Sequence, residues 1–262
     1  VATPDEWSDC HLCDDNKAAH FLARTGRTAE ALEGFRRILR RRDRCRRVPQ
    51  NTYSMILQPL LQTGQVAEAL AAHLQGMSML ERSGDFLEMA ARHVRFAVWV
   101  RRPEAALRLA ERFWPLAVRS TELDGVFTFY VAVRAAVRDV AQRLGEDRVR
   151  MHLPPEVLTA APPAAPVTTL PGSGPQAEPE AGPQAFSHPA GPAQNQPATG
   201  GGPRWSGEAP RVEVALLAAW LDQRLTDLAR RFDQRNGNAA FAQRLQHDCE
   251  LDRLSCDAPP GS

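Results

Sequence analysis

Apolar residues recur at helical spacing through two separate parts of the chain. Their intervals of three and four residues predict amphipathic helices, most of them in consecutive pairs. The expected helices span, in order, 15–25 and 29–42, 50–63 and 66–82, 86–100 and 103–118, then 122–144, 212–233 and 239–254. The pattern therefore predicts an all-α protein.

Local signals mark the ends of several of these helices. Gly26 suits a C-terminal cap, and Thr28 suits the N-cap of the helix that follows. Pro103 suits a first helical position. Pro59 lies inside the helix expected at 50–63, where its missing N–H should produce a kink.

One phrase of the sequence occurs twice. Residues 22–32 read LARTGRTAEAL and residues 60–70 read LLQTGQVAEAL, which are identical at seven of eleven positions. A weaker third copy has Leu107 in phase, although Arg101 stands where the glycine is expected. Because a helical hairpin cannot bury its apolar stripe alone, stacked copies would need the same turn and the same small packing residue. The recurrence predicts a repeat of 37–38 residues.

The second half of each copy resembles the tetratricopeptide repeat family, in which a small residue, an aromatic residue and a second small residue follow the loop glycine. These places are filled by Ala31, Phe35 and Ile38, by Ala69, His73 and Gly76, and by Ala106, Ala110 and Phe113. The first half departs from the family, because its Gly-x-x-Tyr places hold Ala19, Leu22, Leu57 and Leu60. The period also exceeds the family's roughly 34 residues. The resemblance covers residues 14–120, and a helical solenoid of another class remains an alternative.

The resemblance implies a solenoid of stacked helical hairpins whose first helices line a concave face that binds a protein or peptide. The residues expected on that face are Asn16, His20, Asn51, Ser54, Gln58, Glu88 and Arg95. Such polar side chains can hold a peptide backbone or terminus. A solvated helix face is the alternative interpretation.

Composition divides the chain into segments. Residues 152–210 hold 14 of the 21 prolines and few large apolar side chains, so they cannot offset the entropy cost of ordering and predict a disordered linker. We therefore expect a repeat domain at 1–151, the linker, a C-terminal helical hairpin at 211–256 and a disordered tail at 257–262. The apolar stripe of 212–233 predicts docking on the helix at 122–144. A mobile hairpin or homodimer contact is the alternative.

Charge and targeting signals favour a cytoplasmic protein. The formal net charge is +1, so no global field attracts nucleic acid or membrane. The first residues, VATPDEWSD, do not form a signal peptide, and no run reaches the ~18 apolar residues of a membrane span. The five cysteines are then expected to be reduced, metal-bound or catalytic.

Three cysteines are expected to converge. Cys10 and Cys13 form a C-x-x-C motif just before the first helix, and Cys45 follows its hairpin partner. The ends of an antiparallel hairpin lie together, so zinc is a candidate ligand, with His11 or His20 as a fourth donor. Small buried thiols are the alternative.

Arginines dominate residues 36–47, with eight in twelve positions. The residues predicted to bind an anion or an acidic partner are Arg40, Arg41, Arg42, Arg44, Arg46 and Arg47. They favour phosphate or an acidic segment, but no aromatic residue interleaves them to stack on bases. A solvated face is the blander interpretation.

The sequence contains no recognisable catalytic motif such as G-x-S-x-G, a Walker loop or H-E-x-x-H. The leading hypothesis is a non-enzymatic scaffold that binds a protein or peptide without a cofactor, apart from the zinc candidate. The alternatives are a regulatory nucleic-acid-binding module that uses the arginines of 36–47 with a possible zinc staple beside them, and a metal-dependent enzyme.

Overall fold

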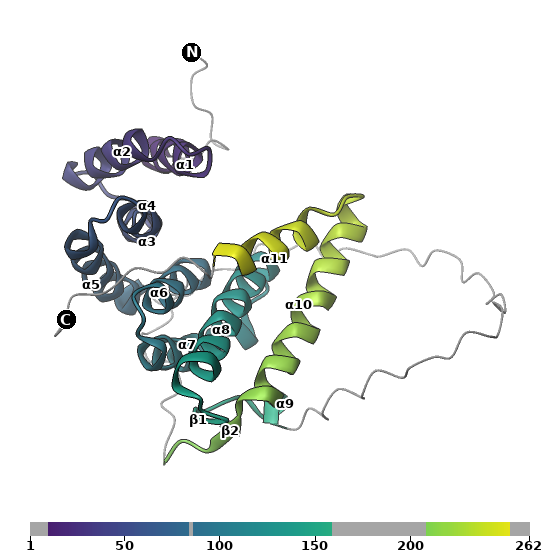
Figure 1. Cartoon of the computed structure of the whole chain (residues 1–262). Coiled ribbons are helices and arrows are strands. Elements are labelled where there is room, and N and C mark those ends of the chain that lie inside the picture. Colours follow the sequence, from purple (N-terminus) through teal and green to yellow (C-terminus); the bar gives the residue numbers. More distant parts are fainter. Residues whose placement is uncertain (1–9, 84–85, 159–207, 252–262) are drawn as a thin grey trace.

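The structure is a computed structural model that describes residues 10–83, 86–158 and 208–251 (Figure 1). It is mostly helical, which confirms the helical class. The first part contains α1 (His11–Arg24), α2 (Thr28–Arg40), α3 (Gln50–Met55), α4 (Leu57–Gln62), α5 (Val66–Ser83), α6 (Leu87–Trp99), α7 (Pro103–Arg119) and α8 (Leu123–Leu144). After these come β1 (Arg148–Arg150), α9 (Pro155–Leu158), β2 (Arg211–Glu213), α10 (Val214–Asn236) and α11 (Ala240–Leu251).

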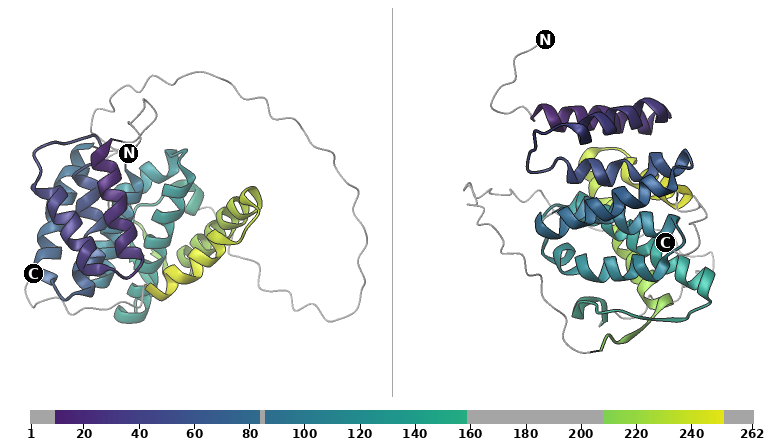
Figure 2. Two further views of the ribbon diagram at one scale, coloured as in Figure 1. Left: turned by 90° about the horizontal axis from the view of Figure 1, so that it is seen from above. Right: turned by 90° about the vertical axis from the view of Figure 1, so that its left-hand side faces the viewer.

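Successive helix pairs lie in layers, with α1 and α2 at one end (Figure 2). The first helices of the pairs contact one another in the order α1, α3, α6 and α8. The helix expected at 50–63 is divided into α3 and α4 at Ile56. Pro59 explains the break, because it lacks the N–H that would bond to the carbonyl of Met55 and its ring crowds that carbonyl.

The turns inside the three pairs share one conformation. Gly26, Gly64 and Arg101 have φ angles of 80°, 73° and 58°, all in the left-handed region. In each turn the next residue donates its N–H to the carbonyl five residues earlier: Arg27 to Leu22 at 2.9 Å, Gln65 to Leu60 at 2.8 Å and Arg102 to Ala97 at 2.8 Å. These are the bonds of a Schellman C-cap. The third turn thus keeps the geometry without the glycine.

The small residue after each turn is fully buried. Ala31, Ala69 and Ala106 are each 0% exposed, which leaves no room for a larger side chain. The N-cap expectation for Thr28 is wrong, because α2 begins at Thr28 itself and Arg27 occupies the cap position. Arg27 instead forms an ion pair with Glu30 in the first turn. Pro103 is at the start of α7, as expected.

Two histidines meet between α5 and α6. Nδ1 of His73 lies 3.0 Å from Nδ1 of His93, so one ring donates a hydrogen bond to the other. His73 stacks on Phe96 with ring centroids 4.7 Å apart, so its side chain packs as an aromatic ring. Burial lowers the pKa of His73 to about 4 and that of His93 to about 3, so both rings are neutral at pH 7.

A two-stranded sheet joins the ends of the proline-rich segment. β1 pairs antiparallel with β2, and Val149 lies opposite Val212. The apolar periodicity of the sequence did not predict these strands, which are only three residues long. The linker expected at 152–210 is also too wide, because Leu153 and Val157 are buried in the core. Residues 159–207 and the tail at 257–262 lie outside the described residues.

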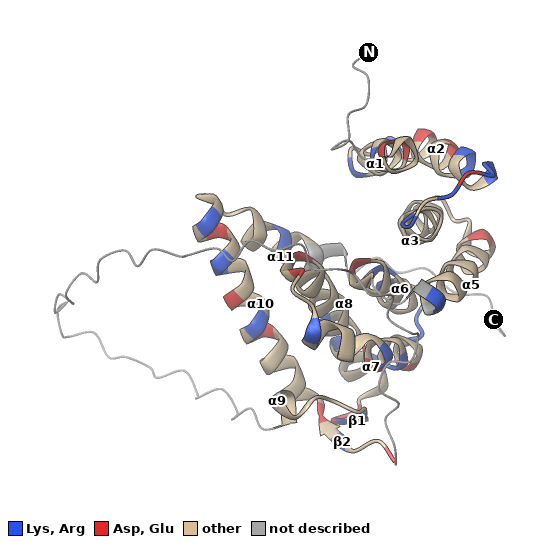
Figure 3. Ribbon diagram, turned by 180° about the vertical axis from the view of Figure 1, so that it is seen from behind, with Lys and Arg blue, Asp and Glu red and all other residues tan. Residues whose placement is uncertain are grey.

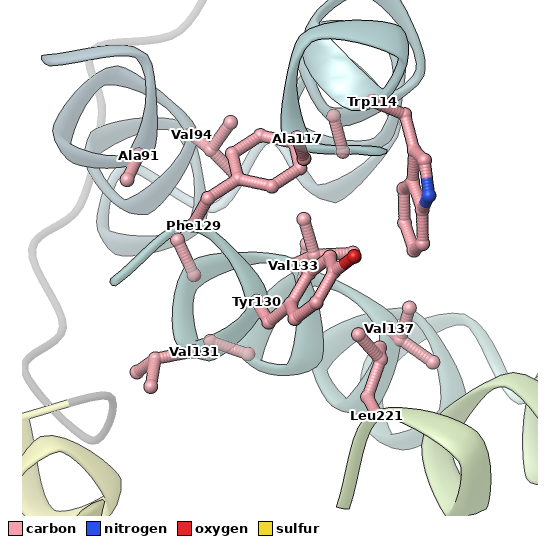
Figure 4. Close-up of a cluster of buried hydrophobic side chains, with 14 of the residues drawn as sticks. Ala91, Val94, Trp114, Ala117, Phe129, Tyr130, Val131, Val133, Val137 and Leu221 are labelled. Carbon is pink, nitrogen blue, oxygen red and sulfur yellow. The ribbon is translucent and has the colours of Figure 1, made fainter. Parts of the chain in front are cut away.

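Helix α8 is buried on most of its surface by α6, α7 and α10 (Figure 4). Trp220 of α10 lies edge-on to Tyr130 of α8, with ring centroids 5.5 Å apart, and Leu221 of α10 lies beside Val137 of α8. Asp222 of α10 also accepts from Arg138 of α8 at 2.9 Å. The second helix of the last layer therefore comes from beyond the proline-rich segment.

Helix α11 turns back over α8 after a left-handed Gly237. Its N-terminus is capped by Asp233, whose carboxylate accepts from the N–H groups of Phe241 at 2.8 Å and Ala242 at 3.0 Å. The ring of Phe241 stacks on Phe232 of α10 and lies 5.2 Å from the ring of Phe127 of α8.

Replacing Arg101 with glycine should stabilise the protein relative to replacing it with alanine. Both variants lose the arginine side chain, but only glycine adopts the left-handed turn without steric cost. We expect Arg101→Gly to be more stable than Arg101→Ala by about 1 kcal/mol in urea unfolding. Equal stabilities would contradict the left-handed conformation at this turn.

Leu221→Ala should destabilise the whole helical array and not only the C-terminal helices. Leu221 is 0% exposed, so its truncation leaves a cavity between α10 and α8 and costs about 3 kcal/mol. The control is Gln223→Ala on the exposed face of α10, which should change thermal stability little. A Leu221→Ala protein that melts like the wild type would show that α10 does not pack here.

Candidate functional site

A polar cluster spans the first helices of the three pairs, and Arg92 of α6 is at its centre. One guanidinium nitrogen of Arg92 donates to Oδ1 of Asn51 at 3.0 Å and to Oγ of Ser54 at 3.3 Å. The other nitrogen of the fork forms an ion pair with Glu88, one helical turn earlier. These contacts hold the planar guanidinium in one orientation.

Positive charge surrounds this cluster. The charged groups that act most strongly on Arg92 are Glu88, Arg244 and Arg47, and burial together with the two arginines lowers the pKa of Arg92. Glu88 lies 4.0 Å from Arg47. Burial first, and then the charges of Arg92 and Arg24, lower the pKa of the neighbouring His20 to about 4. Four guanidinium groups, those of Arg24, Arg47, Arg92 and Arg244, therefore lie in this region with two carboxylates, Glu88 and Asp124.

Three of the residues predicted to face a ligand are buried instead. Asn16 is 1% exposed, accepts a hydrogen bond from the hydroxyl of Thr52 at 2.8 Å and donates to Sδ of Met55 at 3.1 Å. Asn51 and Ser54 are 8% and 2% exposed. The sequence prediction was wrong for these three because their polar atoms have partners on neighbouring helices. Asn16 of α1 bonds to Thr52 and Met55 of α3. Asn51 and Ser54 of α3 accept from Arg92 of α6.

The other predicted residues remain partly accessible. His20, Glu88, Gln58 and Arg95 are half-buried, and the guanidinium carbon of Arg95 lies 5.7 Å from the ring centre of Trp99. Beside His20, a hollow of about 370 Å³ follows α1, lined by Lys17, His20, Phe21, Arg24 and Thr25. The ring of Phe21 is 65% exposed there, so an apolar contact is available next to basic side chains.

Sequence reasoning missed Arg92 and Arg244. Arg92 is one turn from Glu88, and an i,i+4 charge pair is a signal that could have identified it. Arg244 reaches this region only because α11 folds back over α8, where it pairs with Asp124 at 2.7 Å. Its guanidinium carbon lies 5.3 Å from the ring centre of Phe127. No local sequence pattern indicates this position of Arg244, because it depends on the packing of α11 over α8.

A cluster of three thiols lies at the start of the first hairpin. The Sγ atoms of Cys10, Cys13 and Cys45 all lie within 4.8 Å of one another, and those of Cys13 and Cys45 are 3.7 Å apart. Cys10 is the extended N-cap of α1 and Cys13 lies in its first turn. Cys45 sits in a tight turn where the N–H of Val48 donates to its sulfur at 3.3 Å. This cluster can hold a metal ion.

The proposed histidine ligands are not part of the thiol cluster in the described structure. His11 instead lies 2.9 Å from Asp43 through Nε2, and His20 belongs to the polar cluster around Arg92. Burial and hydrogen bonds with the other thiols raise the pKa of Cys13 to about 12. A backbone N–H donated by Cys13 lowers the pKa of Cys10.

The arginine run at 36–47 is used largely for local contacts, and its blue segment follows α2 beside α3 (Figure 3). Arg41 pairs with Asp15 at 2.9 Å and with Asp43 at 2.8 Å. Arg44 donates to the carbonyls of Arg41 and Asp43. Arg46 and Arg47 both lie over the ring of Phe86. Arg40 and Arg42 are exposed.

Comparison with protein-family models, with curated proteins and with solved structures found no match to this chain. Among the described residues, no helix combines the length and the apolar character that crossing a membrane requires.

Acid should weaken folding through His20. Its folded pKa of about 4 lies below its ordinary value of 6.5, so the unfolded chain takes up the proton first as the pH falls. Stability should therefore decrease between about pH 6.5 and pH 4, and His73 and His93 act in the same direction. Between pH 7 and pH 5, the melting temperature of His20→Gln should therefore fall less than that of the wild type. His247→Gln on an exposed site is the control, and identical pH profiles for all three proteins would contradict the burial of His20.

Proposed function

We propose that the chain is a non-enzymatic scaffold that binds an acidic protein segment on the face formed by α1, α3 and α6. The observation that carries this proposal is the excess of guanidinium charge around His20 and Arg92, where four arginines, Arg24, Arg47, Arg92 and Arg244, are accompanied by two carboxylates, Glu88 and Asp124. An incoming carboxylate would be attracted by this excess of positive charge.

The local shape supports a peptide rather than a small anion. The hollow along α1 places the exposed ring of Phe21 beside Lys17 and Arg24. A segment that carries acidic residues next to an apolar one would match both features. The successive contacts of α1, α3 and α6 offer an extended track for such a segment.

The resemblance to tetratricopeptide repeats supports this proposal and remains a prediction. The shared turn conformation at Gly26, Gly64 and Arg101, and the buried alanine five residues after each of them, agree with a repeated hairpin. In such solenoids the first helices supply the binding face, which here is the face that carries the polar cluster.

The nucleic-acid alternative has less support. Duplex binding would need the guanidinium groups of 36–47 to face phosphates, whereas Arg41 and Arg44 contact neighbouring acidic or carbonyl groups. We therefore assign that run mainly to bracing the loop between α2 and α3.

Charge reversal on the proposed face should abolish peptide binding. The probes are fluorescent peptides rich in Asp and Glu with one embedded aromatic residue, measured by anisotropy at two salt concentrations. We expect Arg24→Glu and Arg47→Glu each to weaken binding about tenfold or more, with affinity also falling as salt rises.

The matched control is Arg37→Glu, which makes the same charge change at an exposed position of α2. It should leave peptide affinity unchanged. If all three variants lost the same affinity for the peptides, the effect would come from net charge alone. That result would contradict binding at a defined face. Tight binding of duplex DNA that is lost in Arg40→Glu and Arg42→Glu would favour the alternative function.

A further inference from the structure

The three thiols of Cys10, Cys13 and Cys45 come from two segments that the sequence separates by more than thirty residues. Cys10 and Cys13 occupy the N-cap and first turn of α1, so they lie on one side of the helix end. Cys45 is brought beside them because α2 runs antiparallel to α1 and its following loop returns to that end.

The spacing of the sulfurs fits a metal. Zinc–sulfur bonds of about 2.3 Å at tetrahedral angles place two thiolates about 3.8 Å apart. The Sγ atoms of Cys13 and Cys45 are 3.7 Å apart, and the sulfur of Cys10 lies within 4.8 Å of both. The N–H of Val48 donates to the sulfur of Cys45 at 3.3 Å, which fixes the position of that sulfur.

The surroundings also suit a metal–thiolate centre. Three thiolates and one divalent ion carry a net charge of −1, and the loop beside them is rich in arginine. The apolar cluster at this end is small, with only Leu12, Ile38 and Val48 as its buried members in the described part of the chain. So small a core holds the ends of the hairpin weakly, and a metal would add a cross-link.

We propose that Cys10, Cys13 and Cys45 bind one zinc ion as a three-thiolate site that staples the start of α1 to the loop before α3. The fourth coordination position is open to water, because the described structure brings no fourth side chain into the cluster and His11 pairs with Asp43. Binding replaces the thiol protons, which pass to solvent, and involves no oxidation or reduction.

The staple lies away from the α1 part of the acidic-peptide site, although Arg47 of that site belongs to the loop that carries Cys45. Residues Arg24 and Phe21 lie at the opposite end of α1 from Cys10. Removal of the metal should therefore loosen the N-terminal hairpin first, since α1 and α2 form the outermost layer of the array (Figure 2).

The test uses the full-length reduced protein, purified without added metal and then titrated with Zn²⁺. We expect one zinc per chain by elemental analysis in the wild type and in Cys256→Ser, the control. In Cys13→Ser and Cys45→Ser it should fall below a few tenths. His11→Ala should keep its zinc, and loss of zinc there would overturn the open fourth position.

A second measurement does not depend on how the variants fold. Alkylation of the wild-type thiols, located by mass spectrometry, should slow at least tenfold on adding Zn²⁺ at Cys10, Cys13 and Cys45 but not at Cys256. The proposal would be overturned by equal alkylation rates with and without Zn²⁺.

Discussion

The burial of α8 is the constraint on which the rest of the structure depends. This helix is apolar around most of its circumference, and its buried side includes Phe127, Phe129 and Val133 at 0% exposure. A helix of that kind is stable only when neighbours cover it on several sides. Helices α6 and α7 cover part of it, and α10 must cover the remainder because no helix follows α8 directly in the sequence.

This requirement links the two ends of the proline-rich segment and the proposed binding face. The docking of α10 on α8 brings β2 beside β1, and the two strands pair antiparallel. It also carries α11 back across α8, where Arg244 pairs with Asp124 and adds its charge to the field around Arg92. The C-terminal helices therefore complete the core and contribute to the electrostatics of the polar cluster.

Local physics explains which features the sequence could predict. Gly26 and Pro103 mark the end of one helix and the start of another. Their own backbone preferences favour those positions, so the sequence alone predicts them. The left-handed turn at Arg101 was not predicted in this way, since a left-handed arginine is held by its surroundings and not by its own preference. The strands at 148–150 and 211–213 are too short to show a period, and their pairing spans the whole proline-rich segment.

The candidate site could be predicted only in part from the sequence, because long-range contacts decide which of its residues are buried. A polar residue on a first helix looks alike whether it faces solvent or bonds to another buried polar group. Asn16 and Ser54 proved to be buried because Thr52 and Arg92 satisfy them, and those partners lie on other helices. The cysteine cluster was predictable because hairpin geometry fixes which ends meet.

Native-state hydrogen exchange of the full-length chain tests most directly whether α10 completes the core around α8. The account predicts that the central amides of α8 and α10 exchange together, through one opening with a single urea dependence, and are the most protected in the chain. Fast exchange throughout α10, with α8 still strongly protected, would contradict it.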